Sequence, residues 1–192
     1  MPGPHFRTGP KPELTLRIRR LGLRPSPYLL VVSVARQRLS LFRRNSPRTH
    51  QSWVGNYRWV REYVISTSRF GTGQVEGSNR TPLGLHRIAR KIGAGQPIGT
   101  VFKSRLPVGL TWDDRSDAAI VHRILWLEGL EPGFNRGGSV DTFRRYIYIH
   151  GFGDETTLGR PQSHGCIHLA AVDLMPLFDR LAEGTLVWIE EQ

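Results

Sequence analysis

Cysteine and lysine are scarce in this sequence. Among 192 residues Cys166 is the one cysteine, so no disulfide can form within the chain. The net charge is +11, yet the only lysines are Lys11, Lys91 and Lys103, so arginine carries nearly all of the positive charge. Arginine suits an anionic polymer, a nucleic acid or an anionic membrane, and it is equally typical of a solvated surface. Zinc-finger, RNA-binding and helix-turn-helix patterns are missing, so we expect no specific nucleic-acid partner.

Long apolar runs are missing as well. The longest, residues 28–35, is interrupted by Ser33 and is far shorter than the roughly 20 residues that cross a membrane. It follows a proline-rich stretch and leads directly into arginines, so it is not recognisable as a signal peptide, and a cytoplasmic location is not excluded. The glycines at residues 71–73 lack the Walker spacing, so they do not indicate a phosphate site.

Strands and loops are favoured by the 21 glycines and 13 prolines, and the length suits a single domain. Alternating apolar residues predict a first hairpin and further strands at residues 28–42, 62–67, 85–89, 119–127, 145–150 and 185–189. Leu174, Leu177, Phe178 and Leu181 have helical spacing, with Gly184 at the expected end of the helix. We therefore expect a β-rich α+β fold with one clear C-terminal helix.

Two regions flank or interrupt this pattern. Residues 1–27 form a basic leader rich in proline and glycine, in which Leu14, Leu16 and Ile18 alternate with polar residues and predict an edge strand. Residues 90–143 form an unusual middle with glycines at both ends, which favours either a lid or an elaborated surface insertion.

The chemistry of the chain is concentrated near its C-terminus. Cys166 needs a nearby base because only its thiolate is a good nucleophile. His150 ends a predicted strand and is the candidate base, and His164 lies two residues before the cysteine as an orienting or auxiliary group. Gly165 gives the backbone freedom and offers its N–H, with that of Cys166, to the oxyanion of an acyl-transfer intermediate.

Together these residues resemble a known family. His150-Gly151 followed by Ser163 to Ile167, with Thr81 to Gly84 upstream, is similar to the signature of the L,D-transpeptidase (YkuD) family. The resemblance implies a sandwich-like catalytic domain over residues 28–190 that acts outside the cytoplasmic membrane, in the envelope or periplasm. It also implies that Cys166 attacks a peptidoglycan stem peptide without a cofactor. The resulting thioester passes to a second stem, or to water as in a carboxypeptidase or hydrolase.

Substrate contacts are expected from several further side chains. The family usually has arginine where this chain has His168, so positive charge for the substrate must come from elsewhere. Arg144 shares the strand parity of His150, Arg160 lies in the loop before Cys166, and Arg87 lies on an earlier strand. Tyr148 and Ser163 complete the candidate substrate-binding set.

Two other classes of function remain open at this point. His150, His164, Cys166 and His168 could together supply four zinc ligands if the last three lie on one side of an extended segment. Alternatively, the basic chain could hold an anionic polymer without chemistry, in which case Cys166 would be dispensable.

Overall fold

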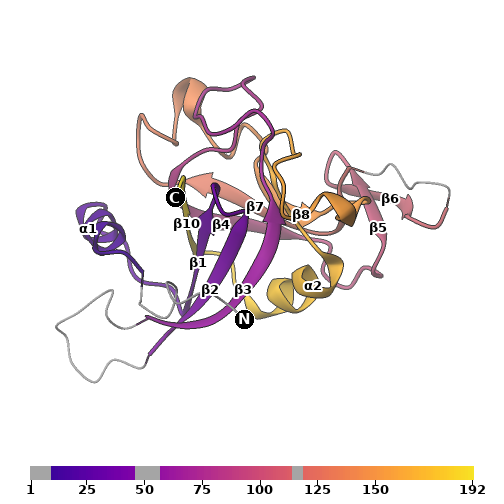
Figure 1. Cartoon of the computed structure of the whole chain (residues 1–192), viewed down its shortest axis with the longest axis horizontal. Helices are drawn as coiled ribbons and strands as arrows, with labels where there is room; N and C mark the ends of the chain where they lie inside the picture. Colours follow the sequence, from indigo (N-terminus) through magenta and orange to yellow (C-terminus); the bar gives the residue numbers. More distant parts are fainter. Residues whose placement is uncertain (1–9, 46–56, 114–118) are drawn as a thin grey trace.

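The computed structural model describes residues 10–45, 57–113 and 119–192. The first nine residues of the predicted leader lie outside this part of the chain. Figure 1 shows helix α1 and the β5–β6 hairpin at opposite ends of the molecule, with helix α2 against the sheet between them. In the described residues no helix combines the length and apolar character needed to cross a membrane.

The strands form one ten-stranded sheet that closes on itself. Its strands are β1 Tyr28–Ser33, β2 Arg38–Arg44, β3 Tyr57–Ser66, β4 Gly84–Ile92, β5 Thr100–Lys103, β6 Leu106–Leu110, β7 Val121–Gly129, β8 Tyr148–Gly151, β9 Ile167–Leu169 and β10 Leu186–Glu190. Their order is β4-β10-β1-β2-β3-β9-β8-β7-β5-β6, and β4 also pairs with β7. The expected sandwich is thus replaced by a closed sheet from which β5 and β6 extend.

Burial of strand β1 on both faces explains why its residues 28–32 are all apolar. Leu30 and Val32 point into the main core, whereas Leu29 and Val31 belong to a second cluster on the other face, beneath α1. A strand buried on both faces has no solvent side and therefore loses the usual alternation of polar and apolar residues. The predicted hairpin of β1 and β2 is confirmed.

The predicted edge strand near the N-terminus is wrong. This segment is helix α1, Pro12–Arg20, in which Leu14 and Ile18 are buried one turn apart and Leu16 is 65% exposed. Leu14, Leu16 and Ile18 fit a period of two, whereas only Leu14 and Ile18 share one helical face, and the packing of these two on the sheet decides for the helix. Pro12 is compatible with the first helical turn because its missing N–H has no partner there in any case.

The predicted C-terminal helix is confirmed as α2, Ala171–Arg180. Its buried residues Leu174, Leu177 and Phe178 pack in the main core. The helix ends before Gly184, with Leu181 already extended, so Gly184 lies in a later turn and is not the cap. The described residues also contain the 3-10 turns Gly138–Val140 and Glu155–Thr157.

The strand that carries His150 is shorter than predicted. It begins at Tyr148, because Tyr146 has a φ of +57° and lies outside it, with 51% of its surface exposed. The unusual middle of the chain contributes β7 to the closed sheet, between β8 and β4. That residues 90–143 form a lid stays a prediction.

Candidate active site

The candidate catalytic residues gather where β8 and β9 run parallel to each other. Ile149 lies opposite Ile167, and His150 lies opposite His168. Both isoleucines belong to the main core. Side chains alternate along a strand, so His150, His168 and the preceding Cys166 share the opposite face. The register therefore brings the predicted base and nucleophile to one surface of the sheet.

The turn before Cys166 is held by one hydroxyl. Ser163 Oγ donates to Cys166 O at 2.6 Å and accepts the Gly165 N–H at 3.2 Å. Gly165 has a φ of +122°, and a Cβ there would lie 3.2 Å from Ile147 Cδ1. Ser163 is buried and both functions of its hydroxyl serve the turn, so it holds the loop where a substrate contact was expected. The Gly165 N–H, an expected oxyanion donor, is used inside the turn.

The upstream Thr-Pro segment supports the same turn. Thr81 Oγ1 donates to Gly165 O at 3.1 Å and accepts the N–H of Ser68 at 3.0 Å. Thr67 O accepts the Ser163 N–H at 2.9 Å. Two stretches far apart in the sequence thus fix the backbone beside Cys166, which gives a physical reason for their occurring together.

Cys166 carries a neutral thiol in this arrangement. Its Sγ accepts the Tyr148 N–H at 3.4 Å and donates to Tyr146 O at 3.5 Å. Burial raises the pKa of Cys166 to about 11, while the Tyr148 N–H and the charge of Arg145 act in the opposite direction. The sulfur is therefore positioned by backbone groups and stays protonated near neutral pH until a base removes the proton.

His150 is held in the form that a base requires. Its Nδ1 lies 2.7 Å from Gly151 O, and since a carbonyl only accepts, Nδ1 carries the proton and Nε2 keeps its lone pair. Burial lowers the pKa of His150 to about 4. Among the hydrogen bonds of the described residues none joins His150 to Cys166, and such contacts commonly tighten only when substrate binds.

The raised pKa of the thiol predicts an unusual pH profile of its reactivity. We expect the rate of Cys166 alkylation by iodoacetamide to rise about tenfold per pH unit between pH 7 and 10, because the reactive thiolate is scarce over this range. Mass spectrometry of the intact protein measures the rate, and Cys166→Ala corrects for reaction at other groups. A rate that levels off below pH 8 would show a resting thiolate and contradict this prediction.

His164 lies away from the face that holds His150 and His168. It is exposed, its Nε2 lies 3.0 Å from Arg69 Nη2, and its ring centroid is 5.6 Å from that of Phe70. A guanidinium only donates, so His164 accepts through Nε2 in this contact. Because the chain turns at Gly165, residues 164–168 are not one extended segment. The alternation that would place His164, Cys166 and His168 on one side as zinc ligands is therefore absent.

His168 is a buried neutral ring beside the base. Its centroid lies 4.9 Å from that of His150, and Phe152 stacks on its other side at 4.4 Å. Its Nδ1 is buried without a hydrogen-bond partner. Burial lowers the pKa of His168 to about 3. The residue therefore brings no fixed positive charge to the position where arginine was expected.

The zinc alternative gains no support from the geometry. Within the described ranges no group of three or more histidine, cysteine, aspartate or glutamate residues is placed to hold a metal ion. The four candidate ligands are divided, because His164 contacts Arg69 on the surface while His150 and His168 are buried.

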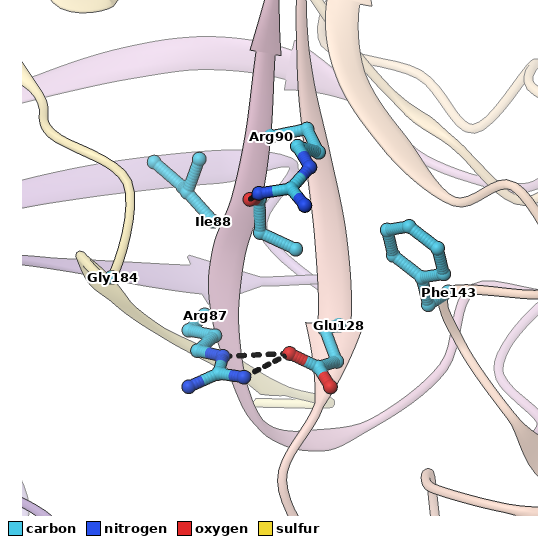
Figure 2. Close-up of a pocket in the computed structure, with 7 residues that line it drawn as sticks. Arg87, Ile88, Arg90, Glu128, Phe143 and Gly184 are labelled. Atoms are coloured by element: carbon cyan, nitrogen blue, oxygen red, sulfur yellow. Dashed lines mark hydrogen bonds and ion pairs between the residues drawn. The ribbon is translucent and has the colours of Figure 1, made fainter.

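Arg87 lies in a pocket separate from the thiol. Figure 2 shows its guanidinium turned toward Glu128 of the neighbouring strand, with Nε and Nη2 both 2.6 Å from Oε2. The pocket has a volume of about 400 Å³ and is also lined by Phe143 on the far side of β7. Neither Cys166 nor His150 lines it. The ion pair gives Arg87 a structural partner, and its assignment to substrate is not favoured.

Arg144 and Arg160 are both exposed and make local hydrogen bonds. Arg144 is exposed in the turn before β8, where its N–H donates to Asp141 Oδ1 at 3.0 Å. Arg160 is exposed, and its Nη2 donates to Thr156 O at 3.3 Å. The parity argument for Arg144 fails because the chain is not extended at Tyr146.

Arg145 is the residue that sequence reasoning missed. It is half-buried, and its guanidinium donates to Gly73 O at 3.2 Å, Gln74 O at 2.8 Å and Arg80 O at 2.6 Å. Its charge favours the thiolate of Cys166. The sequence shows two adjacent arginines, Arg144 and Arg145. Alternation along the predicted strand favours Arg144, whereas the structure places Arg145 near the thiol. Arg145 therefore holds the glycine-rich loop against the site and supplies a fixed charge near the sulfur.

Comparison with known proteins connects this site to a family. A family model described as the L,D-transpeptidase catalytic domain (YkuD) matches residues 27–189. No curated protein matches the chain.

Several solved structures resemble the fold. Bd1075 from Bdellovibrio bacteriovorus is 16% identical with a TM-score of 0.52, over 87% of this chain and 48% of that one. An L,D-transpeptidase from Mycobacterium smegmatis is 17% identical with a TM-score of 0.48, over 85% and 58%. L,D-transpeptidase 3 from Mycobacterium tuberculosis, solved with a faropenem-derived adduct, is 16% identical with a TM-score of 0.48, over 86% and 60%. This chain spans about half the length of Bd1075, and the likeness concerns the fold alone.

Proposed function

Because the chain belongs to the L,D-transpeptidase catalytic domain (YkuD) family, we propose that it is a cysteine-dependent L,D-transpeptidase acting on peptidoglycan stem peptides. The observation that carries this proposal is the placement of Cys166 and a neutral, oriented His150 on one face of paired strands. Acyl transfer through a covalent intermediate requires a nucleophile with a base close to it.

The first half-reaction forms a thioester. His150 Nε2 takes the proton of Cys166 Sγ as the sulfur attacks the carbonyl carbon at the L-centre of the diamino acid in a tetrapeptide stem. We assign the Cys166 N–H as a donor to the resulting oxyanion, since the Gly165 N–H is engaged by Ser163. Collapse breaks the amide bond, and the leaving D-alanine takes the proton from His150.

The second half-reaction releases the acyl group. The side-chain amine of a second stem attacks the thioester and His150 takes its proton. The carbon–sulfur bond breaks as an amide forms, and His150 passes the proton to the leaving sulfur, which restores the thiol. Attack by water instead gives a carboxylate, which is the outcome of an L,D-carboxypeptidase. Dividing one exchange between amides into these steps lowers the barrier of each. The substrate places this activity in the cell envelope.

Defined muropeptides test the proposal directly. Wild-type protein incubated with a tetrapeptide stem is expected to release D-alanine and to form either a cross-linked dimer or a tripeptide, both resolved by liquid chromatography and mass spectrometry. Cys166→Ala is expected to yield none of these products. The two products separate transfer from hydrolysis. Equal release of D-alanine by the wild type and Cys166→Ala would refute the proposed role of the cysteine, and no release by either would refute the proposed reaction.

A second readout tests the thioester chemistry without a stem peptide. A carbapenem such as imipenem is expected to add the mass of one drug molecule to the wild-type protein, because its strained carbonyl can acylate the thiol. Cys166→Ala serves as the matched control and is expected to keep its original mass. An adduct that persists in Cys166→Ala would place the reactive group elsewhere.

A further inference from the structure

A rigid aromatic surface lies beside the thiol. The Trp126 ring of β7 stacks on Phe143 at 4.0 Å with an angle of 5°, and it meets the Tyr148 ring edge-on at 5.5 Å. Tyr146 lies tilted against the same indole at 5.6 Å. The indole N–H donates to Phe143 O at 3.0 Å, which fixes its orientation. These contacts hold four aromatic rings in place next to the site.

Arg105 lies over this surface from the tip of the β5–β6 hairpin. Lys103 pairs with Leu106, so Ser104 and Arg105 form a two-residue turn, and both have the positive φ that such a turn requires, +49° and +69°. The Arg105 guanidinium carbon lies 5.2 Å from the Trp126 ring centroid and 5.0 Å from that of Tyr146. A defined turn and two ring contacts thus fix the position of the charge.

Two tyrosines contact both Arg105 and the thiol of Cys166. Tyr146 contributes its ring to Arg105 and its carbonyl to Cys166 Sγ, at 3.5 Å. Tyr148 donates its N–H to the same sulfur at 3.4 Å, and its side chain accepts a hydrogen bond from Arg105. Tyr146 and Tyr148 therefore contact both the guanidinium and the thiol, which places Arg105 in the neighbourhood of the nucleophile.

Arg105 makes one side-chain hydrogen bond, to Tyr148, and so has further donors to spare. Arg145 donates to three backbone carbonyls, and Arg69 contacts His164. Among the ion pairs formed within residues 10–45, 57–113 and 119–192, none includes Arg105. A guanidinium has five N–H donors, so Arg105 keeps donors beside the one that hydrogen-bonds to Tyr148, and a carboxylate can accept two of them in parallel.

We propose that Arg105 binds a carboxylate of the acyl-donor peptide next to the scissile carbonyl, so that the site selects a free carboxylate over a carboxamide at that position. This inference rests on the proposed function, because it assigns specificity to the same thiol. Two carboxylates have the right chemistry. One is the C-terminal carboxylate of the leaving residue, and the other is the side-chain carboxylate of a diamino dicarboxylic acid at the third position.

Three synthetic donor peptides distinguish these sources. The first has both carboxylates, the second is a C-terminal amide, and the third is amidated on the side chain of the third residue. For the wild type we expect amidation of the bound carboxylate to lower kcat/KM by about 10- to 100-fold, the range of a charge-assisted contact. Arg105→Ala is expected to show the same loss on the first peptide and no further loss on the matching amide, while Arg105→Lys recovers part of the rate.

Lys103→Ala is the matched control, since it removes one exposed positive charge from the same hairpin. We expect it to retain the preference for the carboxylate. Equal losses by Arg105→Ala on all three peptides would overturn the inference and assign Arg105 to shaping the hairpin.

Binding separates this inference from the proposed reaction. With Cys166→Ala protein, isothermal titration calorimetry is expected to show tighter binding of the carboxylate peptide than of the matching amide, and Cys166→Ala/Arg105→Ala is expected to lose that preference. If the wild type turns over no peptide but this Arg105-dependent preference is found, the reaction is refuted and the carboxylate site stands. If Arg105 affects neither binding preference nor turnover, the carboxylate site is refuted.

Discussion

His150→Ala is expected to slow acylation of Cys166 by about 10²- to 10⁴-fold while leaving the fold intact, because the thiol then loses its general base. The thiol pKa of about 11 makes this dependence strong, since few molecules carry a thiolate at neutral pH without a base. Stopped incubation with imipenem followed by intact-protein mass spectrometry measures the acylation rate. Far-ultraviolet circular dichroism checks that the sheet is retained.

His164→Ala is the matched control for this experiment. It removes an exposed imidazole two residues from Cys166 that contacts Arg69 and lies outside the face of His150. We expect a much smaller change in rate than for His150→Ala. Equal acylation rates in the wild type and His150→Ala across pH 5 to 9 would contradict the role of His150.

The neutral state of both groups favours one course for the proposed reaction. The pKa of His150 is lowered to about 4 and that of Cys166 is raised to about 11, so the resting pair is imidazole and thiol. A resting ion pair would need the opposite shifts. We therefore expect proton transfer to accompany the proposed attack on the substrate, and groups that can stabilise the developing negative charge, such as Arg145 and the Cys166 N–H, to matter most in the transition state.

The local part of the site could be predicted from the sequence. His150 and Cys166 lie within one short stretch, and a strand followed by a turn was sufficient to bring them near each other. The positive charges could not be predicted in the same way. The alternation of side chains along a strand predicts that Arg144 and His150 share a face. The left-handed conformation of Tyr146 interrupts the strand, so this alternation does not extend back to Arg144. Arg105 reaches the site only through the pairing of a distant hairpin with β7.

The same contrast applies to the fold. The hairpin of β1 and β2 and helix α2 follow from patterns within short segments, and both are confirmed. Closure of the sheet depends on the pairing of β4 with β7, which are separated by β5 and β6 in the sequence. Periodicity describes which face of a strand is buried and does not identify its partner, so a sandwich and a closed sheet were equally compatible with it.

Acid is expected to destabilise the protein well before its carboxylates are protonated. His86, His150 and His168 are buried, and burial lowers their pKa values to about 4, about 4 and about 3 from an ordinary value of 6.5. Above pH 6.5 these rings are neutral in both the folded and unfolded states and contribute nothing to the pH dependence. As the pH falls below 6.5, the unfolded chain binds protons that the folded state does not, so the free energy of unfolding decreases.

Each of these rings lowers the free energy of unfolding by about 1.4 kcal/mol per pH unit between its unfolded and folded pKa values, so the three together contribute about 4 kcal/mol per unit near pH 5. Urea unfolding at pH 7, 6 and 5 measures this slope. His86→Gln removes one titrating ring that is fully buried and hydrogen-bonded to Gly84 O, and it is expected to reduce the slope by about a third. His164→Ala, which removes an exposed ring, is expected to leave the slope unchanged. A free energy of unfolding that stays constant from pH 7 to 5 would show that these histidines are not held neutral by the fold.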